Sequence, residues 1–333
     1  MTFLQILWFV LIFVLITGYF VLDGFDLGVG VLYPVLGKDE AGKSILRRAI
    51  GPVWDGNEVW LLTAGGALFA AFGPAYATTF SGFYLAIMLV LFGLILRAVA
   101  LELRAHDAAN AKVWDACFFV GSLLPALLFG VAVGNVIEGI QLNANGDYTA
   151  GFFALLNPFA LVCGLLGLAM MCAHGCAWIA VKTEGDLHDR AAALRSKFQI
   201  VALALFALAS VLPTAAPYGG ATASAVCFVF AILYAVVTAL GFAKKNLGDI
   251  PQFILSAVGC VALVGLFAAN LFPCIVPASD MAYSLTVANS SGSEVGLGAM
   301  AVIALIGVPL VLLYHVIIYR KFAGKVTAED EGY

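Results

Sequence analysis

The chain has 333 residues, of which 63% are hydrophobic and only 11% are charged. An average soluble domain carries about 25% charged residues, so a soluble fold of this size could not cover so much apolar surface. The apolar residues extend over the whole length, which also excludes a soluble domain held by one membrane anchor. The net charge of −4 says little about partners, because the sidedness of Lys and Arg carries the information in a membrane protein.

The seven cysteines are an odd number, and nearly all of them fall within apolar stretches, where Cys acts as a small packing residue. We therefore expect no disulfide framework. The apolar stretch at residues 3–19 has no basic residues before it and no small-residue cleavage site after it. These features indicate a retained first helix rather than a signal peptide.

Nine stretches are long and apolar enough to span a bilayer, which takes about 20 residues. They are residues 4–28, 50–73, 79–103, 113–140, 152–181, 196–216, 220–243, 251–274 and 295–319. The pattern predicts an all-α, polytopic integral membrane protein with a single transmembrane domain over residues 1–325 and a short tail at 326–333. Nine helices suit two four-helix bundles plus a ninth helix, although residues 1–140 and 150–275 show no clear repeat.

The basic residues alternate between connections. All 16 Lys and Arg lie around the ends of the first, third, fifth, seventh and ninth predicted helices, and the other connections hold none. Short cytoplasmic loops of membrane proteins carry an excess of Lys and Arg. With an odd number of helices, this alternation predicts an N-terminus outside and a C-terminus and tail in the cytoplasm.

Ionisable residues within the predicted spans are concentrated in the first three helices. Each costs at least about 2.5 kcal/mol inside a membrane, which makes these residues functional candidates. Asp23 and Asp26 lie one turn apart in the first helix, and Asp55 and Glu58 lie one turn apart in the second. Arg97 enters the same layer from the third helix.

Four carboxylates could thus share one buried guanidinium, roughly 10 to 15 Å from the cytoplasmic face at 1.5 Å per helical residue. Not all four could then be ionised, and a group of this kind suits proton relay. The alternative is a static cluster that ties the first three helices together.

Two histidines, His174 and His315, lie in predicted helices and could in principle ligate a haem. Cys172 and Cys176 flank His174 at metal-like spacing. These cysteines share one helix face, however, while a residue midway between them points almost the opposite way. We therefore predict no metal site and no haem ligation by this chain.

Aromatic residues are plentiful in the second predicted helix, including Trp54 and Trp60. Core packing and interfacial anchoring explain such residues in most membrane proteins. A slot for a quinone ring or a lipid beside Trp54 and Trp60 is the functional alternative.

Several motifs together resemble subunit II of the cytochrome bd type quinol oxidases. The longest are residues 21–30 (VLDGFDLGVG) and 54–72 (WDGNEVWLLTAGGALFAAF), and the shorter ones are 80–84 (FSGFY), 156–159 (LNPF), 272–273 (FP) and 284–286 (SLT). The likeness covers almost the whole chain in order. One departure is that residues 287–289 read VAN where many members have Trp-Asp.

The resemblance implies a subunit of a quinol:oxygen oxidoreductase in the bacterial cytoplasmic membrane. Its partner, subunit I, would hold two haems b and one haem d, and this chain would bind none directly. Asp55, and next Asp26, match the family's proton-path acids. A structural quinone, a small accessory subunit, quinol and lipids are further expected partners or ligands, and nucleic acid is not.

Two other functions remain open from the residues alone. A proton- or cation-coupled transporter would explain the buried acids and the sidedness, but not the long motif at residues 54–72. A b-type cytochrome in its own right would rest only on His174 and His315.

Overall fold

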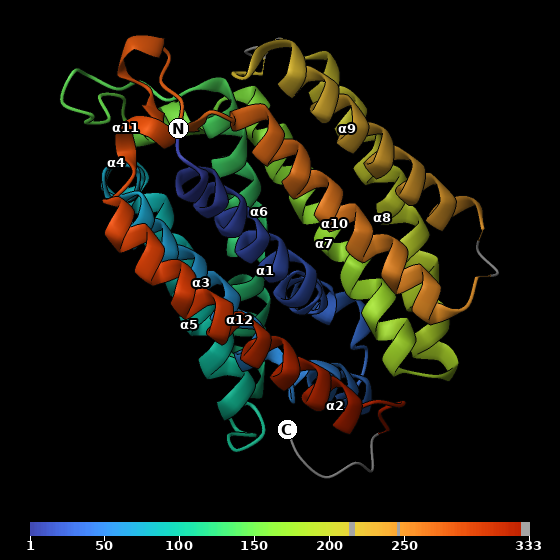
Figure 1. Ribbon diagram of the computed structural model, residues 1–333. Helices are drawn as coiled ribbons and strands as arrows, with labels where there is room; N and C mark the ends of the chain where they lie inside the picture. Colours follow the sequence, from blue (N-terminus) through green and yellow to red (C-terminus); the bar gives the residue numbers. More distant parts are fainter. Residues whose placement is uncertain (213–216, 245–246, 328–333) are drawn as a thin grey trace.

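Long helices dominate the computed structural model, which describes residues 1–212, 217–244 and 247–327 (Figure 1). Eight of these helices are long and apolar enough to cross a membrane. They are α1 (Phe3–Leu36), α5 (Tyr84–Leu103), α6 (Ala111–Glu138), α7 (Pro158–Lys182), α8 (Gly185–Val211), α9 (Gly220–Ala243), α10 (Asp249–Leu271) and α12 (Glu294–Lys321). The one predicted span that is not among these eight is the second, 50–73. It corresponds to α3 (Trp54–Ala71), which is less apolar because its first turns carry Asp55, Asn57 and Glu58.

The predicted boundaries were wrong at several breaks in the first third of the chain. The second predicted helix, 50–73, is preceded by a separate helix, α2 (Glu40–Ile50), because Pro52 interrupts the chain between them. The third, 79–103, is divided at Phe83 into α4 (Gly73–Gly82) and α5. The first helix runs eight residues beyond its predicted end and includes Pro34.

The later boundaries differ where caps and polar turns decide them. Residues Phe152–Leu156 form a 3-10 turn, and α7 starts only at Pro158, capped by the Asn157 side chain. Helix α8 begins 11 residues before its predicted start, since its first turns are hydrophilic. Part of its predicted end, residues 213–216, and residues 328–333 of the predicted tail lie outside the described residues.

A small folded segment covers the end of the bundle that holds the N-terminus. The strands β1 (Cys274–Val276) and β2 (Leu285–Thr286) pair antiparallel, with a 3-10 turn at Met281–Tyr283 between them and α11 (Val287–Ser290) after them. This segment lies in what the sequence indicated to be a loop. The Thr286 side chain and Asn289 cap α11 reciprocally.

The core of the molecule lies where α1 and α7 cross. Helix α7 packs against α1, α6, α8 and α10, and α1 also packs against α3 and α6. Gly28 allows the close crossing, because a Cβ added there would lie 2.0 Å from the Met171 carbonyl oxygen. The contacts of α7 with α1 and α6 join the two halves of the chain, so the contacts alone do not divide the helices into the two predicted bundles. Helix α12 lies along the outside (Figure 1).

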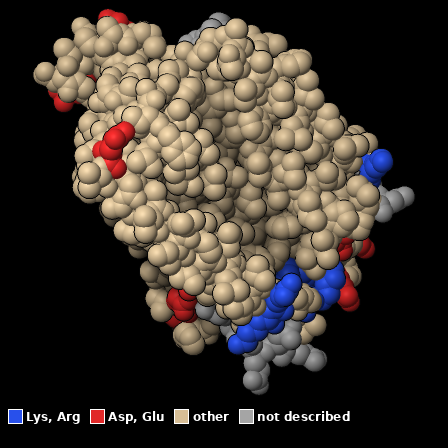
Figure 2. All heavy atoms as spheres, in the orientation of Figure 1, with Lys and Arg blue, Asp and Glu red and all other residues tan. Residues whose placement is uncertain are grey.

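Basic side chains gather at one end of the bundle. On the face shown in Figure 2, Lys and Arg lie only toward the end that carries the C-terminus in Figure 1. We call this end, which includes α2, the α5–α6 connection and the last turn of α12, the basic end. The N-terminus, α11 and the β1–β2 pair lie at the opposite end.

Candidate functional site

A buried ion-pair cluster joins α1, α3 and α5. The Arg97 side chain is fully buried and donates to Asp23, with Nη1–Oδ2 at 3.1 Å and Nη2–Oδ1 at 2.5 Å. The same Nη2 donates to Glu58 Oε1 at 2.5 Å. This bidentate pairing of Arg97 with Asp23 is the geometry in which a guanidinium binds a carboxylate best.

Asp26 joins the cluster through an amide rather than through the guanidinium. Asn57 Nδ2 donates to Asp26 Oδ2 at 2.7 Å, and Tyr319 of α12 donates its hydroxyl to Asn57 Oδ1 at 3.0 Å. Tyr319 therefore fixes which end of the Asn57 amide faces Asp26. The other carboxyl oxygen, Asp26 Oδ1, is buried without a hydrogen-bond partner, which leaves it open to a proton.

We refer to Asp23, Asp26, Asn57, Glu58 and Arg97 as the Arg97 cluster. It holds three carboxyl groups and one guanidinium, and Asp23 and Asp26 are fully buried while Glu58 is partly exposed. In a medium of low dielectric, such a set balances its charge only when it also holds protons. The cluster can therefore take up and release protons, which is the chemistry that a relay needs.

The prediction that four carboxylates share Arg97 was wrong for two of them. Asp26 bonds to Asn57, as described above, and Asp55 is exposed on the surface of α3. Asp55 faces outward because of the helical period: it shares its face of α3 with Val59 and Leu62, which are 41% and 72% exposed. Among the residues that the structure describes, the Asp55 carboxylate accepts a hydrogen bond only from the backbone amide of Gly56, at 2.7 Å.

Both membrane histidines have their two ring nitrogens engaged. His174 is fully buried, with Nδ1 at 2.7 Å from Ser256 Oγ and Nε2 at 2.9 Å from the Val21 carbonyl. His315 Nδ1 bonds to the Val311 carbonyl, and its Nε2 accepts from Trp60 at 3.3 Å. Neither ring therefore offers a free nitrogen to a haem iron.

The two tryptophans proposed for quinone contact are packing residues in the structure. Trp60 is 7% exposed and lies directly on Gly18, where an added Cβ would come within 2.1 Å of its ring. Trp54 is 9% exposed and belongs to the core near the basic end. The contact of Trp54 and Trp60 with a quinone or a lipid stays a prediction.

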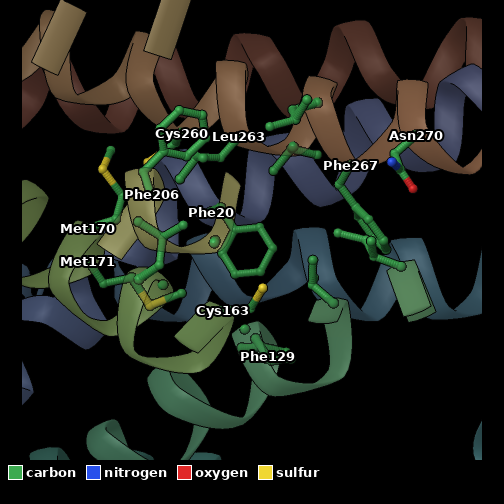
Figure 3. A pocket seen from close by; sticks show the side chains of 18 of the residues that line it. Phe20, Phe129, Cys163, Met170, Met171, Phe206, Cys260, Leu263, Phe267 and Asn270 are labelled. Carbon is green, nitrogen blue, oxygen red and sulfur yellow. The ribbon is translucent and has the colours of Figure 1, made fainter. Parts of the chain in front are cut away.

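An apolar cavity of about 270 Å³ lies elsewhere, between α1, α6, α7, α8 and α10 (Figure 3). Its lining is almost entirely hydrophobic, and the side chains labelled in Figure 3 are Phe20, Phe129, Cys163, Met170, Met171, Phe206, Cys260, Leu263, Phe267 and Asn270. Asn270, in the last turn of α10, supplies one polar group, and its Oδ1 is buried without a partner. The cavity thus fits an apolar chain with one hydrogen-bonding group near the end opposite the basic end.

A second charged network ties the basic end together. Arg104 donates to Glu40 at 2.5 Å and to Asp115 at 2.7 Å, and Lys43 donates to Asp115 at 2.7 Å. The hydrogen bond from Arg104 lowers the pKa of the largely exposed Glu40 carboxyl. This network holds α2 against the start of α6. Its ion pairs are partly exposed, so we assign it a modest contribution to stability and no part in proton transfer.

Asn57 and Tyr319 were missed by sequence reasoning. Asn57 carried a usable signal, since a buried amide in a membrane helix needs a partner and this one lies one residue before Glu58. Tyr319 gave no signal in the sequence, because only the packing of α12 against α3 brings its hydroxyl within reach of Asn57.

The fold and the site define a polytopic helical membrane protein built around a buried charged cluster. The chain belongs to the cytochrome bd terminal oxidase subunit II family, whose model matches residues 4–322. It is 38% identical to a probable cytochrome oxidase subunit 2 of Haemophilus influenzae, over 98% of this chain and 96% of that one. It is 34% identical to the cytochrome bd-I ubiquinol oxidase subunit 2 of Escherichia coli over the same shares.

A Bacillus subtilis relative, a cytochrome bd ubiquinol oxidase subunit 2, is 34% identical over 97% of each chain. The structure also resembles a chain of the bd oxidase from Geobacillus thermodenitrificans, with a TM-score of 0.77 over 96% of this chain and 99% of that one. The identity to that chain is 14%, so this likeness concerns the fold.

Proposed function

We propose that this chain is the second subunit of a bd-type terminal oxidase, which oxidises quinol and reduces oxygen to water. The match of the family over residues 4–322 carries the proposal. The Arg97 cluster supports it independently, because reduction of oxygen to water consumes protons and the cluster is a buried set of proton-exchanging groups. The haem chemistry itself belongs to the partner.

The partner in this proposal is subunit I, with two haems b and one haem d. The occupied ring nitrogens of His174 and His315 support a division in which the iron ligands lie in that subunit. This chain then stabilises subunit I and contributes to its supply of protons. Quinol reacts at the partner, and a small accessory subunit would be a further member of the complex.

The enzyme would lie in the bacterial cytoplasmic membrane with the basic end in the cytoplasm. The excess of Lys and Arg on cytoplasmic loops supports this orientation. The N-terminus, α11 and the β1–β2 pair would then face outward. Cytoplasmic protons would enter from the side on which Asp55 and the Arg97 cluster lie.

The face of α3 that carries Asp55 is the surface that subunit I would cover. Val59, Leu62 and Phe69 on this face are 41%, 72% and 63% exposed. A carboxylate among such residues would cost at least about 2.5 kcal/mol if it faced lipid. A protein partner that provides hydrogen bonds removes this cost and gives Asp55 a contact through which a proton can leave.

Within this proposal, the Arg97 cluster holds protons in the interior of the subunit, and Asp55 passes them to the partner subunit. Glu58 follows Asp55 by one turn and is partly exposed, whereas Asp26 and Asp23 lie deeper. Arg97 offsets the negative charge of the cluster when a proton leaves. The unpaired Oδ1 of Asp26 is the atom at which a proton would be held.

The apolar cavity between α1, α6, α7, α8 and α10 is where a structural quinone or a lipid chain would bind. Its apolar lining suits an acyl or isoprenoid chain, and Asn270 could donate to a carbonyl oxygen. Such a ligand would fill space and stabilise the subunit. This cavity is an alternative to the predicted slot beside Trp54 and Trp60.

A reduced-minus-oxidised absorbance spectrum tests the proposed function. This chain expressed alone should show no haem bands, and co-expression with its subunit I should give haem b and haem d bands and quinol-dependent oxygen consumption. Haem b bands from the chain alone would indicate a cytochrome in its own right. Coupled ion flux into vesicles, without any haem d in the assembled pair, would indicate the transporter.

A further inference from the structure

A second buried guanidinium, outside the Arg97 cluster, has no counter-ion within the described residues. Arg195 of α8 is 3% exposed, and its Nε and Nη1 are buried without a hydrogen-bond partner. A buried guanidinium without a hydrogen-bonded anion costs several kcal/mol. An arginine in this state requires an anion, and none of the residues that the structure describes supplies one by a hydrogen bond.

The acidic residue with the clearest electrostatic effect on Arg195 is Asp249, and it is already engaged. Asp249 Oδ1 lies 3.0 Å from His188 Nε2, and its Oδ2 lies 3.4 Å from Lys325 Nζ. The Asp249 side chain is also 31% exposed, so water screens its charge. Asp249 therefore does not neutralise Arg195.

One buried glutamine follows Arg195 on α8, and a second meets it at Gly241. Gln199 lies one turn further along α8, and Gln252 lies on α10; they are 3% and 0% exposed. Both have an unpartnered Oε1, and both amides border Gly241 of α9. A Cβ at Gly241 would come within 2.4 Å of Gln199 Nε2, so only glycine leaves room for this amide. Gln252 Nε2 already donates to the Lys244 carbonyl oxygen at 2.8 Å. Rotation of the Gln199 amide can present an N–H donor to an anion.

The position of Arg195 along α8 fits the phosphate layer of a bilayer. Arg195 and the exposed Lys197 are the last charged residues of this helix, and the apolar stretch 198–211 follows them. Exposed Lys244 ends α9 one turn after Gly241. Basic groups between transmembrane helices at this level bind the phosphates of anionic lipids.

We propose that Arg195, with the amide of Gln199, forms a binding site for a phosphate group, supplied by an anionic phospholipid of the leaflet at the basic end. The planar guanidinium can donate two parallel hydrogen bonds to phosphate oxygens. Lys244 adds attraction at the rim. The site lies on the α8–α10 side of the molecule, away from Asp55, and does not depend on oxidase activity.

Lipid binding to the purified, delipidated oxidase tests this site. Phosphatidylglycerol is titrated in detergent and followed by native mass spectrometry and by the midpoint of thermal unfolding. Diacylglycerol, which lacks the phosphate, and inorganic phosphate serve as separate additions. The parent is compared with Arg195→Gln, Arg195→Lys and, as a matched control on the same helix, Lys197→Gln.

Phosphatidylglycerol should bind the parent and Lys197→Gln and raise their unfolding midpoints, whereas Arg195→Gln should bind about tenfold more weakly, as expected for a lost charge-assisted hydrogen bond. Without lipid, Arg195→Gln should be at least as stable as the parent, because it removes an uncompensated buried charge. A purely structural role for Arg195 would not produce this reversal.

If inorganic phosphate displaces phosphatidylglycerol, the site binds a phosphate group that can come from solution. If it does not, the natural ligand is the phosphate of a lipid. Equal phosphatidylglycerol binding by the parent and Arg195→Gln would overturn the proposal. If Arg195→Gln does not assemble, Arg195→Lys decides, because it keeps the charge and loses the planar fork. Unchanged binding in Arg195→Lys, together with weakened binding in Lys197→Gln, would equally overturn it.

Discussion

Arg97 and Arg195 are the two most deeply buried arginines of the described residues, and their surroundings differ in charge. Arg97 lies on α5 and bonds to Asp23 of α1 and Glu58 of α3. Arg195 lies on α8 and bonds to no carboxylate of the described residues, while its neighbours Gln199 and Gln252 are neutral amides. Their burial is nearly equal, at 0% and 3% exposed.

This difference shows that burial alone does not assign a role to a charged side chain in a membrane. The partners of Arg97 come from within the subunit and exceed it in number, and this surplus of carboxyl groups supports the proposed role of the Arg97 cluster in holding protons. Arg195 has no anionic hydrogen-bond partner among the described residues, which supports the proposed ligand site. The two proposals therefore differ in the identity of the partners.

Arg97→Gln should have the largest effect of any single change. It would leave Asp23 and Glu58 buried without a cation, at a cost of about 3–5 kcal/mol, the usual effect of removing one partner from a buried pair. We expect little assembled oxidase, measured as haem content per milligram of membrane protein. Arg195→Gln is the matched control and should assemble normally, since it breaks no internal ion pair.

The double variant Arg97→Gln with Asp23→Asn sharpens this test. Removing the opposite charge as well should restore part of the assembly that Arg97→Gln loses, because two neutral amides that can hydrogen-bond then replace the Arg97–Asp23 pair. If the double variant assembles no better than Arg97→Gln alone, the bidentate pair is not the source of the loss.

Tyr319→Phe should have a smaller effect. It removes the hydroxyl that orients Asn57 and so loosens the amide that holds Asp26, at a cost of about 1 kcal/mol. We expect assembly to survive and the pH profile of oxygen consumption to change. Tyr314→Phe, five residues earlier on the same helix and 43% exposed, is the control and should leave the profile unaltered.

Much of the fold could be predicted from the sequence because membrane spans follow from hydropathy. The bounds of α9, Gly220–Ala243, were predicted to the residue, since its apolar stretch begins and ends abruptly. The division between α4 and α5 at Phe83 was not predicted, because only the short Ser81-Gly82 pair precedes it and no proline marks the break. Hydropathy also says nothing of α2, whose amphipathic sequence lies along the basic end.

The candidate site was predicted less completely than the fold. Asp23, Glu58 and Arg97 could be grouped in advance, since charges in one membrane layer must find one another. The outward position of Asp55 could not, because the spacing of Asp55 and Glu58 places both on one side of α3 without saying which residue reaches the core. The lack of a hydrogen-bond partner for Arg195 could not be predicted either, because many charged residues lie near Arg195 in the sequence and only the three-dimensional structure shows which of them pair.

The most direct measurement is quinol-driven oxygen consumption by the assembled Asp55→Asn oxidase. Asn keeps the shape of the side chain and can hydrogen-bond, but it cannot take up and release a proton. Turnover should therefore fall severely with haem content retained, and Asp55→Glu should recover more activity than Asp55→Asn. A parental rate of oxygen consumption in fully assembled Asp55→Asn would contradict the role of this carboxylate in proton delivery.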